Sequence, residues 1–292
     1  MRALEHAAGT TCIPEDPQRI VAFDSRAAAT PLLELGAPVV GTWWGEMEDG
    51  SVYVRGASDI FGQDFVDASG IAPVAGAGGV DLEATAALQP DLILIGEWLT
   101  DQKDQLTSIA PTIVLPENVP YLDLLGMLAD AANLTGSYER ELAEYRARIE
   151  ELREIVGDPS SITVSRMDID ADGIWYYPNW GAVDQVIDDA GFSRPEIQAA
   201  ATSDITGMSI ENVMAFDGDV LLVSYAPRFG QTISDLTSGW MSVGNDLWRT
   251  LPVVQDGNLY WYERDIWTGQ TFASLHAAID GLTLLTAGRS FE

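Results

Sequence analysis

Short apolar runs alternate with helical patterns along the chain, and one long charged helical segment separates them into two sets. Each run is only four to six residues long, which favours buried strands over helices. Strands that alternate with helices are typical of α/β layers. The predicted strands cover residues 19–24, 39–43, 91–95 and 112–115 in the first set, and 162–166, 174–177, 219–224 and 258–262 in the second.

The segment between the two sets predicts a single stiff helix. Its apolar residues recur with spacings of 3, 4, 3 and 4, so they form one stripe along a helix. Ser137 is the predicted N-cap, and Gly157-Asp158-Pro159 ends the helix. We therefore expect an N-terminal lobe at 1–134, a connecting helix at 135–157 and a C-terminal lobe at 158–292. The stripe consists of Leu142, Tyr145, Ile149, Leu152 and Val156.

A segment of the first half has a counterpart in the second half. In each copy a glutamate, Glu83 or Glu211, precedes an aspartate, Asp91 or Asp219, by eight residues, and an apolar strand follows at once. One copy alone would be a common helix-to-strand turn, but one copy per half indicates two Rossmann-like lobes built on the same plan. The copies are LEATAALQPDLILI at 82–95 and IENVMAFDGDVLLV at 210–223.

The charge of the chain excludes several classes of partner. Fifteen basic residues against 45 acidic ones give a formal net charge of −30. Phosphate binding requires a basic surface, so the chain is a poor candidate for nucleic-acid binding, and anionic lipid headgroups would repel it. No apolar run approaches the roughly 18 residues of a transmembrane helix.

The residues of common catalytic and metal sites are scarce. The single cysteine, Cys12, excludes an internal disulfide framework, and the only histidines, His6 and His276, form no cluster for a transition metal. No GxSxG, P-loop or GxGxxG motif follows a predicted strand. We therefore expect neither an enzyme nor a protein-bound metal.

Aromatic and arginine side chains follow the ends of several predicted strands. In open α/β sheets, ligands bind beyond the carboxyl ends of the strands, so these side chains are candidates for contact with a bulky, partly polar ligand. The alternative is that about half of the tryptophans fill the core and that the two arginines form ion pairs. The candidates are Trp43, Trp44, Trp98, Arg166, Tyr177, Trp180, Tyr225, Arg228, Trp240 and Trp267.

In its order of motifs, the chain resembles the bacterial periplasmic binding proteins of the iron–siderophore and cobalamin class, the extracytoplasmic receptors of ABC importers. The resemblance runs from about Gly9 to the C-terminus and includes the lone helix. Its other motifs are IPEDPQRIV at 13–21, LELGAPVVG at 33–41, the segment from Leu82 to Leu94, and LWRTLPVVQDGNLY at 247–260.

The resemblance implies two α/β lobes bridged by one rigid helix, with the ligand in the cleft between the lobes. It implies that Glu83 and Glu211 dock onto arginines of the membrane permease, and that the protein acts as a monomer. It also implies an extracytoplasmic location, in the periplasm or lipid-anchored at the cell surface, although the chain starts without an export signal.

The segment from Arg166 to Tyr177 is similar to the region in which ferric-hydroxamate receptors place an arginine and a tyrosine against the ligand. Receptors for the strongly anionic catecholates present several cations, whereas only Arg166 and Arg228, with Arg26 as a less favoured third residue, are candidates here. We therefore expect a ferric siderophore of the hydroxamate type, whose iron is held by the siderophore and not by the protein. Two alternatives remain open, namely capture of cobalamin or haem, and a hydrolase that processes the siderophore.

Overall fold

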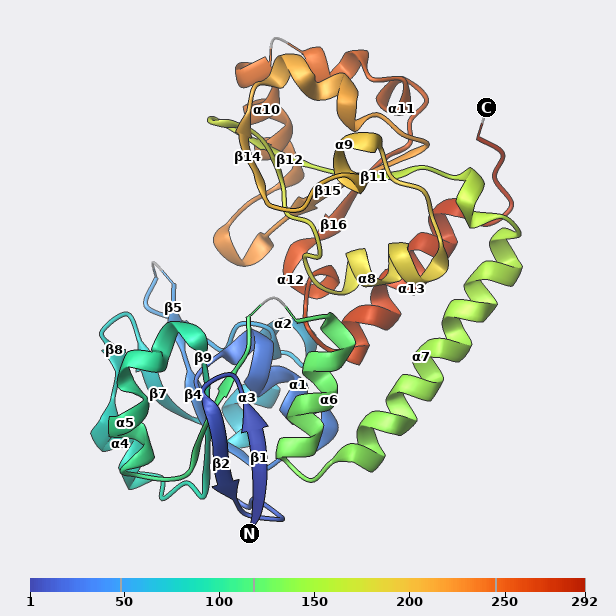
Figure 1. Cartoon of the computed structure of the whole chain (residues 1–292). Helices are drawn as coiled ribbons and strands as arrows, with labels where there is room; N and C mark the ends of the chain where they lie inside the picture. The colour runs from blue at the N-terminus through green and yellow to red at the C-terminus, as the bar shows by residue number, and fades with distance from the viewer. Residues whose placement is uncertain (48, 118, 245, 292) are drawn as a thin grey trace. The chain divides into compact units, whose positions relative to one another are not determined.

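The computed structural model describes residues 1–47, 49–117, 119–244 and 246–291. It forms two compact units, each of which combines helices with a sheet (Figure 1). The predicted α/β fold class is therefore confirmed. Unit 1 comprises Met1–Glu144 and Gly269–Ala273, and unit 2 comprises Tyr145–Thr268 and Ser274–Glu292.

Unit 1 contains a six-stranded sheet in the order β10-β9-β3-β4-β7-β8. All neighbours run parallel except β7 and β8, which form an antiparallel hairpin. The strands are β3 (Ile20–Ala22), β4 (Val39–Trp43), β7 (Ala72–Gly76), β8 (Gly79–Val80), β9 (Leu92–Gly96) and β10 (Thr112–Leu115).

Both faces of this sheet are buried because alternate residues of each strand enter different core clusters. On β9, Leu92 and Leu94 pack with residues of the helices α1 and α6, whereas Ile93 and Ile95 pack with Leu82 and other residues on the opposite face. The helices of unit 1 are α1 (Thr30–Leu35), α2 (Ala57–Ile60), α3 (Gln63–Ser69), α4 (Leu82–Ala87), α5 (Lys103–Thr107) and α6 (Tyr121–Ala131).

The N-terminus forms a hairpin that the sequence did not predict. Strands β1 (Arg2–His6) and β2 (Gly9–Ile13) pair antiparallel, and the His6 Nε2 atom lies 2.8 Å from the Thr11 hydroxyl. Cys12 lies on β2 and is exposed. A second short hairpin joins β5 (Gly45–Glu46) to β6 (Val52–Tyr53).

Unit 2 contains two small sheets. The parallel sheet has the order β11-β15-β16, and the other sheet pairs β12, β13 and β14 antiparallel. The predicted strand at 174–177 therefore belongs to the antiparallel sheet. It is not part of the parallel sheet, which is the part of unit 2 that resembles the sheet of unit 1. The strands are β11 (Val164–Arg166), β12 (Asp168–Asp170), β13 (Gly173–Tyr176), β14 (Ile205–Met208), β15 (Val220–Tyr225) and β16 (Leu259–Glu263).

The long helix α7 (Thr135–Val156) confirms the predicted helical segment. It begins two residues before Ser137, so the predicted N-cap is wrong, and the Leu134 carbonyl accepts the first helical N–H groups. The division between the units falls inside α7, after Glu144, and the domain boundaries expected at 134/135 and 157/158 stay predictions.

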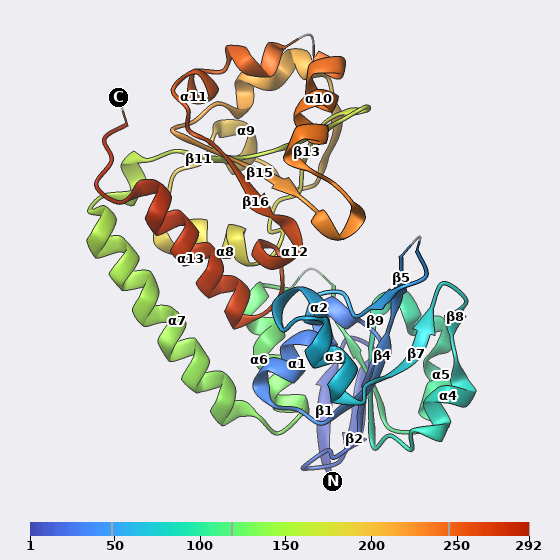
Figure 2. The same ribbon diagram turned by 180° about the vertical axis from the view of Figure 1, so that it is seen from behind.

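The second half of α7 packs within unit 2. Tyr145, Ile149 and Leu152 of the predicted stripe are buried, and the Tyr145 hydroxyl donates to Asp189 over 2.6 Å. Helix α13 lies alongside α7 in both views (Figures 1 and 2), and Arg148 forms an ion pair with Asp280. The helices of unit 2 include α8 (Ala182–Ala190), α9 (Glu196–Ala199), α10 (Ile233–Gly244), α11 (Pro252–Gln255), α12 (Arg264–Trp267) and most of α13 (Phe272–Thr286).

Candidate ligand-binding site

A pocket of about 320 Å³ opens in unit 2 near the carboxyl end of β15. This volume is at the lower end of the range of roughly 300–1,000 Å³ that is typical of ligand pockets. Its position follows the rule that α/β sheets bind ligands beyond the ends of their parallel strands. The hairpin of β12 and β13, the loop before α8, and residues of α10 and α12 complete its walls.

Aromatic side chains form much of the wall of the pocket. The rings of Tyr177 and Trp180 lie 5.0 Å apart, and Trp175 stacks on Tyr177 at 6.3 Å. Trp240 also lines the pocket, but it is only 1% exposed, and its indole N–H donates to the Ile169 carbonyl. Three of the predicted contact residues, Tyr177, Trp180 and Trp240, thus line one cavity together with Trp175, and their contact with a ligand stays a prediction.

The polar part of the pocket contains Asp168 and Arg264. One carboxylate oxygen of Asp168 accepts hydrogen bonds from the Ser224 N–H at 3.0 Å and from the Ser224 hydroxyl at 2.8 Å. Burial raises the pKa of Asp168, against the opposing effect of Arg166 and Arg264. The guanidinium of Arg264 lies over the Phe229 ring at 5.4 Å from its centroid.

Arg264 is the residue of this pocket that sequence reasoning missed most clearly. It directly follows β16, which is the same strand-end position that singled out Arg166 and Arg228. The sequence therefore contains a signal for Arg264, since this arginine lies two residues after the strand predicted at 258–262.

Arg166 occupies a different place from the one expected. It ends β11 as predicted, but it is 1% exposed and does not line the pocket. Its guanidinium pairs with Asp184 at 2.7 Å and donates to the Tyr177 carbonyl. Although burial disfavours the charged form, the Asp184 carboxylate raises the pKa of Arg166. The expectation of direct ligand contact is corrected, because protein acceptors already occupy this side chain.

Three further candidates of unit 2 lie outside the wall of this pocket. Tyr225 ends β15, and Arg228 lies in the 3₁₀ turn Pro227–Phe229 that follows. Trp267 stacks on Tyr262 at 5.2 Å and packs so closely on α13 that a Cβ at Gly281 would lie 2.1 Å from its ring. Trp267 therefore fills space between elements, as the alternative interpretation expected for part of the tryptophans.

In unit 1 the structure brings two of the three candidate tryptophans together. Trp43 ends β4, Trp98 follows β9, and their rings meet edge to face at 5.7 Å. Trp98 is 50% exposed, so this pair presents aromatic surface at the carboxyl edge of the sheet. Trp44 instead lines a separate groove of about 640 Å³ that extends to Glu83.

The two glutamates of the repeated segment occupy matching positions. Glu83 lies in the first turn of α4, after the N-cap Asp81, and Glu211 lies in the first turn of the 3₁₀ helix Ile210–Phe216, after the N-cap Ser209. Both are exposed. Each carboxylate is thus held on a capped turn and points away from the core of its own unit.

Within the described part of the chain, no three His, Cys, Asp or Glu side chains converge in a way that could hold a metal ion. None of the helices described is both long enough and apolar enough to cross a membrane.

Comparisons with known proteins identify the family. Residues 42–265 match the sequence profile of the family described as Periplasmic binding protein. The chain is 28% identical over 289 residues to the Probable siderophore-binding lipoprotein YfiY of Bacillus subtilis (strain 168), covering 91% of this chain and 82% of that protein.

Two solved structures share its fold. Staphylococcus aureus SirA complexed with staphyloferrin B has a TM-score of 0.77 and 20% identity, and the alignment covers 98% of both chains. Petrobactin-binding protein YclQ of Bacillus subtilis has a TM-score of 0.74 and 18% identity, with 99% of both chains covered. Since the family profile matches most of its length, the chain belongs to the periplasmic binding protein family, and it is a binding protein rather than an enzyme, as predicted.

Proposed function

We propose that this protein is the extracytoplasmic substrate-binding component of an ABC importer and captures a ferric siderophore. The observation that carries the proposal is the pocket of unit 2, in which a wall of Trp175, Tyr177 and Trp180 stands beside the guanidinium of Arg264. Aromatic walls with a few polar groups suit a bulky chelate that is apolar outside and polar near its metal. The relative named as a siderophore-binding lipoprotein supports the same ligand class.

The charges of the pocket favour a hydroxamate siderophore over a catecholate one. Three hydroxamates balance the charge of Fe³⁺, whereas three catecholates leave a strongly negative complex. The pocket carries Asp168 and Asp170 beside one arginine, so an anionic complex would meet uncompensated like charge. The names of the two similar structures include staphyloferrin B and petrobactin, so the choice between siderophore chemistries rests on these charges.

In this proposal the protein supplies no ligand to the iron and needs no cofactor. Tyr177 and Trp180 contact the outer surface of the chelate by stacking, and Arg264 binds its oxygen atoms. Within unit 1, Trp43 and Trp98 form an aromatic surface of their own, and Trp44 lines a separate groove. Trp240 supports the wall of the pocket, because its ring packs on those of Trp248 and Trp261.

Delivery requires a permease, and we assign Glu83 and Glu211 to docking. Both carboxylates are exposed on capped turns, one in each unit, which suits recognition by arginines of a membrane partner. Exposed charges of this kind speed and orient an encounter more than they deepen affinity. We propose that the protein works outside the cytoplasmic membrane, which the name of its lipoprotein relative supports, and that it acts as a monomer.

Tryptophan fluorescence tests the ligand class. The purified protein is titrated with a ferric trishydroxamate, a ferric triscatecholate, ferric citrate, cobalamin and haem. The proposal predicts saturable quenching by the trishydroxamate at micromolar concentration or below, with weaker binding of the triscatecholate. Absence of a saturable response to all three iron complexes would refute siderophore capture, and a stronger response to the triscatecholate would refute the hydroxamate assignment.

A further inference from the structure

We propose that the buried ion pair of Arg166 and Asp184 is a positioning device, which fixes the aromatic loop Tyr177–Trp180 in the conformation that receives the ligand. This inference rests on the proposed function for the identity of the ligand. It assigns to Arg166 and Asp184 a role in affinity without any contact between them and the ligand.

The pair holds the loop at both of its ends. Arg166 donates from Nη2 to the Tyr177 carbonyl at 2.5 Å, and Asp184 accepts the Trp180 backbone N–H at 2.7 Å. The two side chains are 1% exposed and are joined by two hydrogen bonds of 2.7 and 3.3 Å. The residues whose rings line the pocket are thus tied by their backbones to one buried charge pair.

The neighbourhood of the pair adds further restraints on the same loop. The Arg166 guanidinium lies 5.4 Å from the centroid of the Trp180 ring, so it contacts the side chain as well as the backbone of the loop. Asn179 and Gly181 adopt positive φ values of 59° and 84°. A Cβ at Gly181 would lie 2.1 Å from the Thr268 carbonyl oxygen, so the loop fits closely against the chain just after α12, the helix that bears Arg264.

A role in overall stability alone explains this arrangement poorly. Burying two charges carries a large desolvation penalty, and apolar side chains of similar volume often stabilise a fold as well or better. A fully hydrogen-bonded buried pair does, however, select one conformation of the groups around it. Here the ion pair fixes the conformation of the loop backbone on one side. On the other side it fixes Arg194, which pairs with Asp184 at 2.9 Å.

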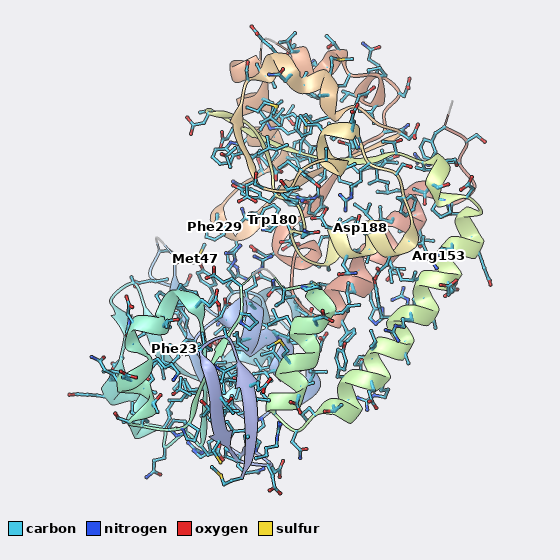
Figure 3. All side chains as sticks on the ribbon, in the orientation of Figure 1. Phe23, Met47, Arg153, Trp180, Asp188 and Phe229 are labelled. Carbon is cyan, nitrogen blue, oxygen red and sulfur yellow. The ribbon has the colours of Figure 1, made fainter. Side chains whose placement is uncertain are left out.

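Asp184→Asn tests the pair with a minimal change of shape. The two carboxylate oxygens of Asp184 accept four hydrogen bonds, from two nitrogens of Arg166, from Arg194 and from the Trp180 N–H. An asparagine amide must turn its NH₂ group toward some of these donors, whichever way it is oriented. Asp188→Asn is the matched control, since Asp188 lies on the same helix, α8 (Figure 3). Its side chain is half exposed and pairs with Arg194 at 2.9 Å.

Hydrogen exchange measured by NMR reports how often the backbone of the loop opens, and it needs no ligand. We expect Asp184→Asn to speed hydrogen exchange of the Tyr177, Asn179 and Trp180 amides. We also expect it to weaken binding of the ferric trishydroxamate by about tenfold, because only about one molecule in ten would then hold the loop in the conformation that binds the ligand. Asp188→Asn should change neither quantity. Unchanged loop exchange in Asp184→Asn, or equal effects of the two variants, would overturn the inference, and the exchange result holds even if no siderophore binds.

The double variant Arg166→Met/Asp184→Leu separates positioning from stability and remains usable if the single variant unfolds. It removes both charges of the pair, and Arg194 keeps its second partner, Asp188, so the fold is expected to persist. It also removes both ties to the loop. We expect native-like thermal stability with fast loop exchange and weakened binding, whereas recovery of slow exchange and wild-type affinity together with stability would contradict the inference.

Discussion

Asp91 and Asp219 perform the same task, one in each unit. Asp91 precedes β9 and accepts the backbone N–H groups of Gln18 and Arg19 at 2.7 and 2.9 Å, just before the neighbouring strand β3. Asp219 precedes β15 and accepts the N–H of Thr163 at 2.6 Å, just before the neighbouring strand β11. The repeat seen in the sequence therefore corresponds to a repeated strand connection in the structure.

Replacing these aspartates should lower stability unequally. The N–H groups of Gln18 and Arg19 are exposed, so water replaces the lost acceptor in Asp91→Ala, whereas the half-buried N–H of Thr163 loses its acceptor in Asp219→Ala at a cost of about 1–3 kcal/mol. Urea denaturation should therefore show a larger loss of unfolding free energy for Asp219→Ala than for Asp91→Ala. Equal losses, or none, would contradict the proposed role of these two aspartates in holding the start of the neighbouring strand.

The glutamates of the same repeat should affect transport and leave binding intact. Glu83→Ala and Glu211→Ala remove exposed charges from capped turns, so we expect ligand affinity and melting temperature to stay unchanged. Uptake of the iron-loaded siderophore by cells with the cognate permease should fall about tenfold in the double variant, because oriented docking is lost. Glu151→Ala, which changes an exposed residue of α7, is the control. An equal fall in uptake with Glu151→Ala would contradict the assignment of Glu83 and Glu211 to permease docking.

Arg264 should matter more for the ligand than the arginines named from the sequence. Arg264→Gln removes the cation that lines the pocket, and a charged hydrogen bond is worth about 1.5–3 kcal/mol, so calorimetry should show siderophore affinity lowered by at least tenfold. Arg249→Gln provides the control, since Arg249 is half exposed and does not line the pocket. Wild-type affinity in Arg264→Gln would exclude Arg264 from the site.

Glu34 should make the stability of the protein depend on pH. Its carboxylate accepts the N–H groups of Phe272 and Ala273 at 2.7 Å each, at the start of α13, and burial raises its pKa from 4.5 to about 7. Glu141 nearby raises that pKa further. Because the folded protein holds this proton more tightly than the unfolded chain, the contribution of Glu34 to stability falls as pH rises from about 4.5 to about 7.

Comparison with Glu34→Gln isolates this effect from the other carboxylates. The difference in unfolding free energy, wild type minus variant, should decrease by up to about 3 kcal/mol between pH 4.5 and pH 7.5 and then level off. A difference that is constant over this range would show that Glu34 titrates normally.

The parts of the fold that the sequence revealed are those with strong local patterns. The strands β9 and β15 are unbroken apolar runs, and α7 has a regular stripe, so each could be read from its own residues. Helix α10 contains Ser, Thr and Gly, which are weak helix formers, so its own residues do not predict it. Which sheet β13 joins depends on its pairing with β12 and β14, and local sequence does not encode that choice.

The site shows the same limit. Tyr177 and Trp180 are predicted to contact the ligand because they follow a strand, a rule that depends only on local order, and both line the pocket of unit 2. Arg166 satisfied the same rule, yet its environment is set by Asp184, 18 residues away, which turns a candidate ligand contact into a buried ion pair. A long-range partner of this kind cannot be read from the strand alone.

Equilibrium dialysis with radioactive iron tests the central claim most directly. The protein is dialysed against ferric trishydroxamate and, separately, against ferric nitrilotriacetate, which contains the same metal without a siderophore. The proposed function predicts saturation at one iron per chain with the trishydroxamate and no retention above background with the nitrilotriacetate. Retention of iron from nitrilotriacetate, or none from the trishydroxamate, would contradict it.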